Sequence, residues 1–157
     1  FIYIKTNSNS PPPVSTDLVL TTELCDSIIS NTELRLTGPF WNWDPVGGPV
    51  GSANGDGTFT FTFSPAPSAD MEYLFVLDGI QEDLVASGLA DSNWSCTPVT
   101  DYSTYANRKW LTTDTLVLND LVYGSCSPCL TSTDISKNIE SSIILYPNPV
   151  NLSLIHI

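Results

Sequence analysis

A run in which threonine and phenylalanine alternate strictly, Thr58–Phe63, constrains the fold more than any other feature of this chain. Successive side chains of a β-strand point to opposite faces, so the three phenylalanines share one face and the three threonines the other. Burying one such ring stabilises a fold by roughly 1.5–3 kcal/mol. The run therefore predicts a half-buried strand whose phenylalanines belong to the core.

Other apolar segments separated by turn residues predict further strands. Asn54-Gly55-Asp56-Gly57 is a strong hairpin signal, because glycine tolerates positive φ. No segment of ten or more residues has helical spacing, and Gly88–Lys109 is expected to be a long irregular loop. We therefore predict an all-β fold, an antiparallel sandwich with long loops and flexible tails. The other expected strands are Asp17–Leu24, Thr32–Thr37, Tyr73–Leu77, Asp114–Tyr123 and a short one at Leu84–Ala86.

The chain is strongly acidic, with five Lys and Arg against seventeen Asp and Glu and a formal net charge of −12. Nucleic acid is excluded as a partner, because no basic patch can neutralise phosphates. A neutral polysaccharide is a better ligand than an anionic one, which the net charge would repel. No apolar run approaches the ~20 residues of a membrane span. The one histidine, His156, lies in the tail, so a His-based catalytic site is not expected.

Composition divides the chain into a central domain and two tails. Residues 1–14 are rich in Asn and Ser and end in three prolines, which predicts a linker from a missing upstream region. Residues 15–129 are predicted to form one β-sandwich binding module, expected to be monomeric. Residues 130–142 are predicted to be a Ser/Thr-rich linker.

Four cysteines, Cys25, Cys96, Cys126 and Cys129, predict disulfides and an oxidising compartment. A bridge between Cys126 and Cys129 would close a tight, strained loop. Cys25 and Cys96 are therefore each expected to join one of the two. Zinc binding through Cys-x-x-Cys is the weaker alternative, because the chain has no second such pair and no nearby histidine.

Large aromatic rings stand at loop edges, where proteins use them to stack on flat ligands such as sugar rings. Trp41 and Trp43 precede a Gly/Pro-rich loop, and the stretch after Gly88 adds further rings and polar side chains. The alternatives are that the tryptophans cap the core, that the tyrosines anchor their loop and that the arginine pairs with a carboxylate. The candidate ligand-binding residues are Trp41, Trp43, Trp94, Tyr102, Tyr105, Asn107 and Arg108.

Acidic side chains raise two further interpretations, a metal site and a catalytic carboxylate pair. The spacing of the loop acids matches no full calcium loop, so no cofactor or metal is predicted, with structural calcium as the alternative. An acidic cluster beside a turn is more often solvated than a glycosidase pair. The residues weighed are Asp44, Asn54, Asp56 and Asp91 for calcium, and Asp78, Glu82 and Asp83 for catalysis.

The motif order between Leu34 and Gln81 resembles that of starch- and glycogen-binding modules with immunoglobulin-like folds. In those modules the tryptophan of Gly-x-Phe-x-x-Trp stacks on a glucose ring, which implies that role for Trp43. Leu74 and Ile80 stand where a lysine and a second tryptophan contact glucan in those modules, so the resemblance does not imply starch as the ligand. The matching positions are Gly38, Phe40, Trp43, Gly57, Phe59, Phe61, Tyr73, Phe75, Asp78 and Gly79.

The segment with Trp94 and Asn107 also looks like modules appended to secreted polysaccharide hydrolases of marine Bacteroidota. The tail resembles the start of the C-terminal sorting domain of the Bacteroidota type IX secretion system, whose hallmark is Tyr146-Pro147-Asn148-Pro149 after a short apolar strand. This resemblance implies export by the type IX secretion machinery and a secreted or cell-surface location. Residues 143–151 are interpreted as a truncated sorting domain. Residues 152–157 match what a sequencing adapter encodes, with a natural apolar strand as the alternative.

The sequence thus predicts a non-catalytic carbohydrate-binding module that targets a secreted polysaccharide-degrading enzyme to a neutral glucan or similar polysaccharide. The module itself is not expected to be an enzyme, although its parent protein is a candidate glycoside hydrolase. The alternative is a structural or adhesive immunoglobulin-like domain of a cell-surface protein, because one sandwich fold serves both roles.

Overall fold

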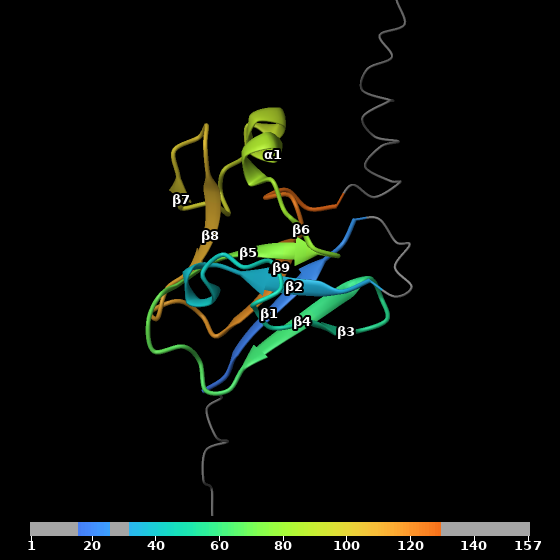
Figure 1. The fold of residues 1–157 in the computed structure, drawn as a ribbon, viewed down its shortest axis with the longest axis vertical. Coiled ribbons are helices and arrows are strands. Elements are labelled where there is room, and N and C mark those ends of the chain that lie inside the picture. The colour runs from blue at the N-terminus through green and yellow to red at the C-terminus, as the bar shows by residue number, and fades with distance from the viewer. Residues whose placement is uncertain (1–15, 26–31, 130–157) are drawn as a thin grey trace, which may run out of the picture.

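A computed structural model describes residues 16–25 and 32–129, which form a sandwich of two β-sheets (Figure 1). The predicted all-β sandwich is confirmed. The tail segments, with the predicted sorting motif Tyr146–Pro149, lie outside the described residues. Within the described ranges, no helix is long and apolar enough to cross a bilayer.

The first sheet has the strand order β3-β4-β1-β9. β1 (Leu18–Glu23) lies between β4 (Thr58–Phe63) and β9 (Val117–Val122), and β3 (Ser52–Ala53) pairs with the outer edge of β4. β1 is antiparallel to β4 but parallel to β9. The predicted antiparallel sandwich therefore contains one parallel pair, since chain direction cannot be read from the apolar pattern of a strand.

The second sheet has the order β2-β5-β8-β7, and all its pairs are antiparallel. β5 is the longest strand of the described chain and also pairs with the short β6. The bounds are β2 (Leu34–Thr37), β5 (Met71–Leu77), β6 (Ile80–Gln81), β7 (Val99–Thr100) and β8 (Ala106–Trp110).

The core lies between the two sheets, as the alternating Thr/Phe run predicts. Phe59 and Phe61 are almost fully buried, and Phe61 lies 5.9 Å from Phe75 of the facing sheet, measured between ring centroids. Phe63 is half-buried and packs at the edge beside Trp41. The other large buried side chains of this cluster are Leu18, Leu20, Leu34, Leu36, Met71, Tyr73 and Trp110.

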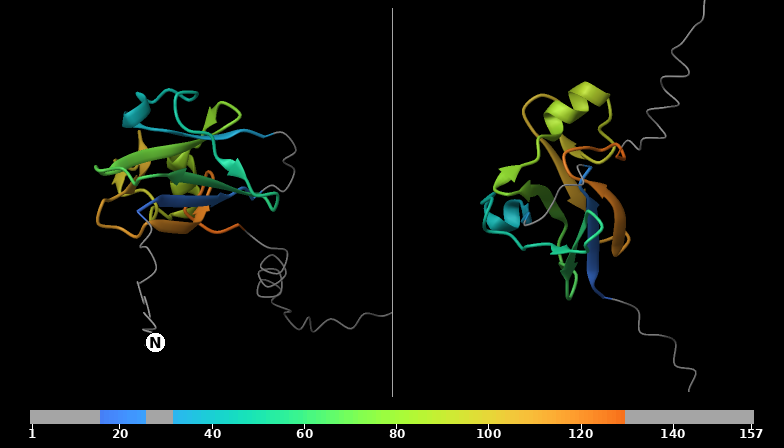
Figure 2. Two further views of the ribbon diagram at one scale, coloured as in Figure 1. Left: turned by 90° about the horizontal axis from the view of Figure 1, so that it is seen from below. Right: turned by 90° about the vertical axis from the view of Figure 1, so that its right-hand side faces the viewer.

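A short helix, α1 (Leu84–Asp91), occupies the segment where a strand at Leu84–Ala86 was predicted. The carboxylate of Asp83 caps the helix by accepting a hydrogen bond from the Ala86 amide at 2.9 Å. Leu84 and Gly88 face the protein, so the apolar residues follow the helical repeat and not the two-residue repeat of a strand. α1 lies with β7 at one end of the sandwich (Figures 1 and 2).

The prediction that Gly88–Lys109 is irregular is also wrong, because this stretch includes β7 and most of β8. β8 reads Ala-Asn-Arg-Lys-Trp and lacks the alternation of a half-buried strand. Arg108 and Asn107 are nevertheless buried, at 2% and 8% exposure, since each has a carboxylate partner. A strand stabilised by buried polar contacts is invisible to a search for apolar periodicity.

Both disulfides join a distant cysteine to the end of the domain, which confirms the predicted pattern. Cys25 pairs with Cys129 and Cys96 pairs with Cys126, each with Cα atoms 5.1 Å apart. The described residues contain no free cysteine. The zinc alternative is therefore excluded for these four thiols, which are all in disulfides.

Removing the Asp83 carboxylate should destabilise the domain through α1. We expect Asp83→Ala to lower the free energy of unfolding by about 0.5–2 kcal/mol, the usual cost of losing an N-cap. Asp91→Ala, at the other end of the same helix, should cost nothing, because a carboxylate there opposes the helix dipole. Urea unfolding followed by circular dichroism measures both, and equal losses would contradict the capping role.

Candidate ligand-binding site

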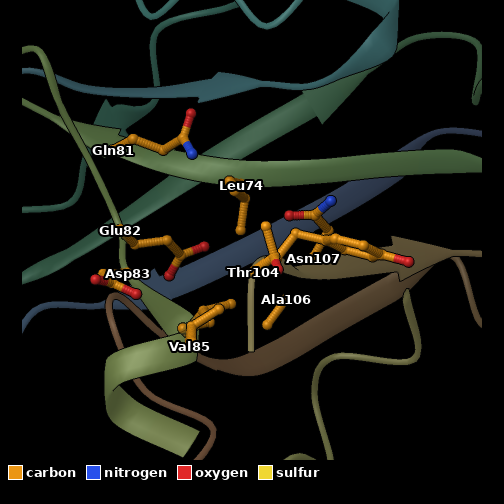
Figure 3. A pocket seen from close by; sticks show the side chains of 10 residues that line it. Leu74, Gln81, Glu82, Asp83, Val85, Thr104, Ala106 and Asn107 are labelled. Carbon is orange, nitrogen blue, oxygen red and sulfur yellow. The ribbon is translucent and has the colours of Figure 1, made fainter. Parts of the chain in front are cut away.

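A pocket of about 360 Å³ lies between α1, β5 and the start of β8 (Figure 3). Its floor is apolar, because Leu74, Leu84 and Ala106 form a small buried cluster separate from the main core. Its remaining walls are mostly polar. The lining residues are Leu74, Gln81, Glu82, Asp83, Leu84, Val85, Thr104, Tyr105, Ala106 and Asn107.

Two of the predicted binding residues, Tyr105 and Asn107, line this pocket. The Tyr105 side chain is 46% exposed, so much of its ring is accessible to a ligand. Asn107 donates its amide hydrogen to Glu72 Oε1 at 2.6 Å, which fixes the orientation of its side chain and leaves the amide oxygen as an acceptor. A pocket with an apolar floor, an exposed ring and fixed polar groups suits a small polar ligand that also has apolar faces.

The loop that carries Tyr105 is held by the Asp101 side chain. Oδ1 of Asp101 accepts hydrogen bonds from the amides of Ser103, Thr104 and Tyr105 at 2.6–3.1 Å. These amides stabilise the carboxylate, so the pKa of Asp101 lies well below its usual range. Tyr102 at the same tip has φ = 65°, a conformation uncommon for a residue with a side chain.

Trp94 anchors this loop from below and is only partly exposed. Its ring packs against the cluster under α1, and a Cβ on Gly88 would come within 2.5 Å of it. Tyr102 meets Trp94 edge to face, with ring centroids 5.1 Å apart. The predicted residues Trp94 and Tyr102 are thus in contact, and only Tyr102, at 58% exposure, presents a large open face.

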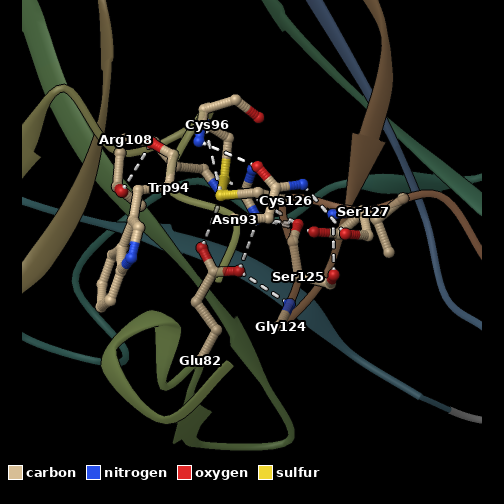
Figure 4. Close-up of a disulfide and its surroundings, with 12 residues drawn as sticks. Glu82, Asn93, Trp94, Cys96, Arg108, Gly124, Ser125, Cys126 and Ser127 are labelled. Carbon is tan, nitrogen blue, oxygen red and sulfur yellow. Dashed lines mark hydrogen bonds and ion pairs between the residues drawn. A yellow bond between two sulfur atoms is a disulfide. The ribbon is translucent and has the colours of Figure 1, made fainter. Parts of the chain in front are cut away.

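Arg108, predicted to contact ligand, is instead buried beneath the pocket, where a ligand cannot reach it. Its Nε and Nη2 atoms each donate to Glu82 at 2.9 Å, and Nη2 also donates to the carbonyls of Val122 and Ser125 (Figure 4). The guanidinium carbon lies 5.1 Å from the centre of the Phe75 ring. The carboxylate-pairing alternative therefore describes this residue, which is not accessible to a ligand.

Glu82 connects the same polar cluster to the pocket wall. Its carboxylate accepts hydrogen bonds from the amides of Phe75 and Gly124, at 2.9 and 2.8 Å, in addition to those from Arg108. The cluster thus joins β5, β8 and the turn after β9. Through Glu82 it also fixes the segment between β6 and α1, which forms one side of the pocket.

Trp41 and Trp43 lie in a separate loop that begins with the 3-10 helix η1 (Pro39–Trp41). Trp41 is half-buried and packs on the core beside Phe63, whereas Trp43 is 37% exposed. The Gly38 carbonyl accepts hydrogen bonds from both tryptophan amides. The backbone here is a tight turn and not a strand, so the two rings have different environments and do not form one platform.

This loop is fixed rather than open. Thr37 donates its hydroxyl hydrogen to the Asp44 carbonyl, and Arg35 donates to the carbonyls of Val46 and Gly48. A Cβ on Gly48 would lie 1.8 Å from the Leu36 carbonyl, so only glycine allows this approach. Trp43 itself has φ = 59°, in the left-handed region of backbone conformation. It thus resembles Tyr102, which also combines an exposed ring with a positive φ.

The acidic side chains weighed for calcium do not gather into a site. In the part of the chain that the structure describes, no three His, Cys, Asp or Glu side chains are close enough to share a metal ion. Asp56 accepts from the amide and hydroxyl of Thr58, and Asp44 accepts from the Val46 amide. Both carboxylates thus stabilise turns.

Sequence reasoning missed two polar residues of the pocket, Gln81 and Thr104, and weighed Asp83 only as a catalytic acid and not as a helix cap. Asp83 precedes an apolar run, which is the signal of a helix N-terminus and could have been recognised. Gln81 and Thr104 carry no such signal, because pairing of β5 with β8 brings them together from distant parts of the sequence.

Comparison with known proteins identifies no family, because no protein-family model, curated protein or solved structure matches this chain.

Breaking the buried ion pair should cost far more than breaking an exposed pair next to it. We expect Arg108→Met to lower the free energy of unfolding by about 3–5 kcal/mol, since Glu82 would stay buried without its counter-charge. Lys109→Met removes a half-exposed contact with Asp70 and should change stability little. Urea denaturation compares the free energies of unfolding of the two variants. Similar losses would contradict a central stabilising role for Arg108.

Acidification should loosen the Tyr105 loop. Because the pKa of Asp101 is lowered in the folded protein, its contribution is complete above the ordinary Asp pKa of about 3.9, declines below that value and is lost only as the pH falls through the lowered pKa. We expect the near-ultraviolet circular dichroism of the Trp94–Tyr102 pair to persist at about pH 4 and to weaken only at a much lower pH, where Asp101 takes up its proton in the folded protein. The Asp101→Ala variant should give a weak signal at every pH. Asp56→Ala, in a distant turn, should keep the wild-type profile, and a loss there would contradict the assignment to Asp101.

Proposed function

We propose that this domain binds a neutral polysaccharide without catalysing its cleavage, with the pocket beside α1 as the primary site. The observation that carries the proposal is the position of Tyr105, a half-exposed ring on a hydrogen-bonded loop above an apolar floor. A sugar ring has apolar C–H faces and polar hydroxyls, and it would stack on Tyr105 while its hydroxyls bond to Asn107, Thr104 and Gln81.

The charge of the described surface supports a neutral ligand. The described residues include three Lys and Arg side chains, and each of them pairs with a carboxylate. Among the described residues no cation is therefore left to neutralise a uronate or sulfate group, and the net charge of −12 would repel one. The pairs are Arg35–Glu33, Arg108–Glu82 and Lys109–Asp70.

The backbone at two exposed rings supports presentation to a ligand. Trp43 and Tyr102 both have positive φ, at 59° and 65°, a conformation that costs of order 1 kcal/mol for such residues. Neither ring is needed to fill the main core. Loops that keep exposed rings in a strained but fixed conformation lose little entropy on binding. Trp43 is therefore proposed as a second stacking surface, apart from the pocket.

A binding role without catalysis fits the carboxylates of the pocket. Glu82 is occupied by Arg108 and two backbone amides, and Asp83 caps α1. Neither is a free acid or base placed against a bound sugar. In this proposal the domain keeps a secreted polysaccharide-degrading enzyme near its substrate by raising the effective concentration of that substrate. Export through the type IX machinery, implied by Tyr146–Pro149, is part of the same proposal.

A structural or adhesive role is the second proposed function. It is favoured by the packing of three of the four tryptophans, Trp41, Trp94 and Trp110, against the protein. Their rings stabilise the two cores and are largely removed from a ligand. Binding measurements decide between the two functions.

Removing the Tyr105 ring should weaken polysaccharide binding. We expect Tyr105→Ala to raise the Kd about two- to twelvefold, since one stacking contact contributes about 0.5–1.5 kcal/mol. Trp43→Ala should cause a smaller increase. The measurement is affinity gel electrophoresis and calorimetry against laminarin, starch, xylan and mannan, with alginate as an anionic polymer that should not bind.

The control is Val117→Ala, which removes a half-exposed apolar side chain from β9 in the other sheet. It should leave the affinity unchanged. Binding of the wild type to none of the neutral polymers would favour the structural role. Binding that survives both aromatic substitutions would exclude ring stacking as the mechanism.

A further inference from the structure

The two ends of the described domain are joined by a short covalent path. Cys25 follows β1 by two residues, and its disulfide partner Cys129 is the last described residue. The chain therefore enters through β1, reaches Cys25 and can leave directly through Cys129. The segment between the two cysteines is a closed loop, and their positions differ by 104 in the sequence.

We propose a further function for the domain: it bears tension between the chain segments on its two sides without unfolding. A pull on residues before Thr16 and after Cys129 passes along β1 and across the disulfide. Tension does not enter the closed loop, since both ends of that loop are held at one covalent bond. Figure 1 shows β1 running through the domain, with the described N-terminal end at one side and the last described residues beyond the other.

The segment that bears the tension, residues 16–25, is already almost fully extended. β1 is already an extended strand, with a rise near 3.3 Å per residue, and a fully stretched chain reaches only about 3.6 Å per residue. Stretching the ten residues from 16 to 25 would therefore lengthen the domain by only a few Å. β1 is also central in its sheet, paired with β4 on one side and β9 on the other, so it resists being drawn out.

The binding pocket lies wholly in the protected loop. Residues 74–107, which include all of its lining, lie between Cys25 and Cys129 in the sequence. A second disulfide, Cys96–Cys126, closes a smaller loop inside the first. The residues between Cys25 and Cys129 should therefore stay folded while tension passes along β1 and the Cys25–Cys129 disulfide. The mechanical function does not depend on the identity of the ligand.

The proposal is tested by pulling the full chain by its two termini in an optical trap, with and without a thiol reductant. The oxidised protein should show no unfolding step attributable to the domain. After reduction of both bridges, unfolding should release roughly 370 Å, the extended length of the 104-residue interval at ~3.6 Å per residue. A step of that size from the oxidised wild type would overturn the proposal.

Matched cysteine variants identify which disulfide prevents unfolding under tension. Cys25→Ser with Cys129→Ser should release roughly 270 Å, because the 30-residue interval of the second bridge stays closed. Cys96→Ser with Cys126→Ser should release nothing, since the outer bridge remains. A full-length step from this second variant would show that the outer bridge does not carry the load. The wild type with and without reductant tests the proposal even if a variant fails to fold.

Discussion

The ion pair between Arg108 and Glu82 is the contact on which the second sheet and the pocket both depend. Two fully buried charges are tolerated only when each is paired and hydrogen-bonded, and here both conditions hold. The guanidinium also holds the carbonyls of Val122 and Ser125. One arginine thereby joins the middle of β8 to the end of β9, so that it connects the two sheets.

This cluster explains why the pocket exists beside α1. Glu82 must lie inside the protein to meet Arg108, and that position fixes the start of the helix one residue later at Asp83. The helix in turn seats Trp94 against Gly88, and Trp94 supports Tyr102. The loop that carries Tyr105 is therefore supported by a chain of contacts that begins at the buried Arg108–Glu82 pair. A pocket with such support is largely preformed, which would favour binding of a ligand.

Apolar patterning predicted the sandwich well and the site only in part. Thr58–Phe63 has a strict alternation because one face of β4 is buried and the other is not, so its structure was evident from the sequence. The strand at Ala106–Trp110 was missed because its burial rests on Glu72 and Glu82, which lie more than twenty residues away. Tyr105 and Asn107 were identified by residue type, but their common pocket depends on pairings that no local pattern records.

The positions of the cysteines also bear on the order of events during synthesis. A chain that emerges N-terminus first exposes Cys25 and Cys96 while both native partners, Cys126 and Cys129, are still to come. During that interval the only bridge open to the first two thiols is a mutual, non-native one. Neither native disulfide can therefore form before synthesis reaches the last four described residues of the domain.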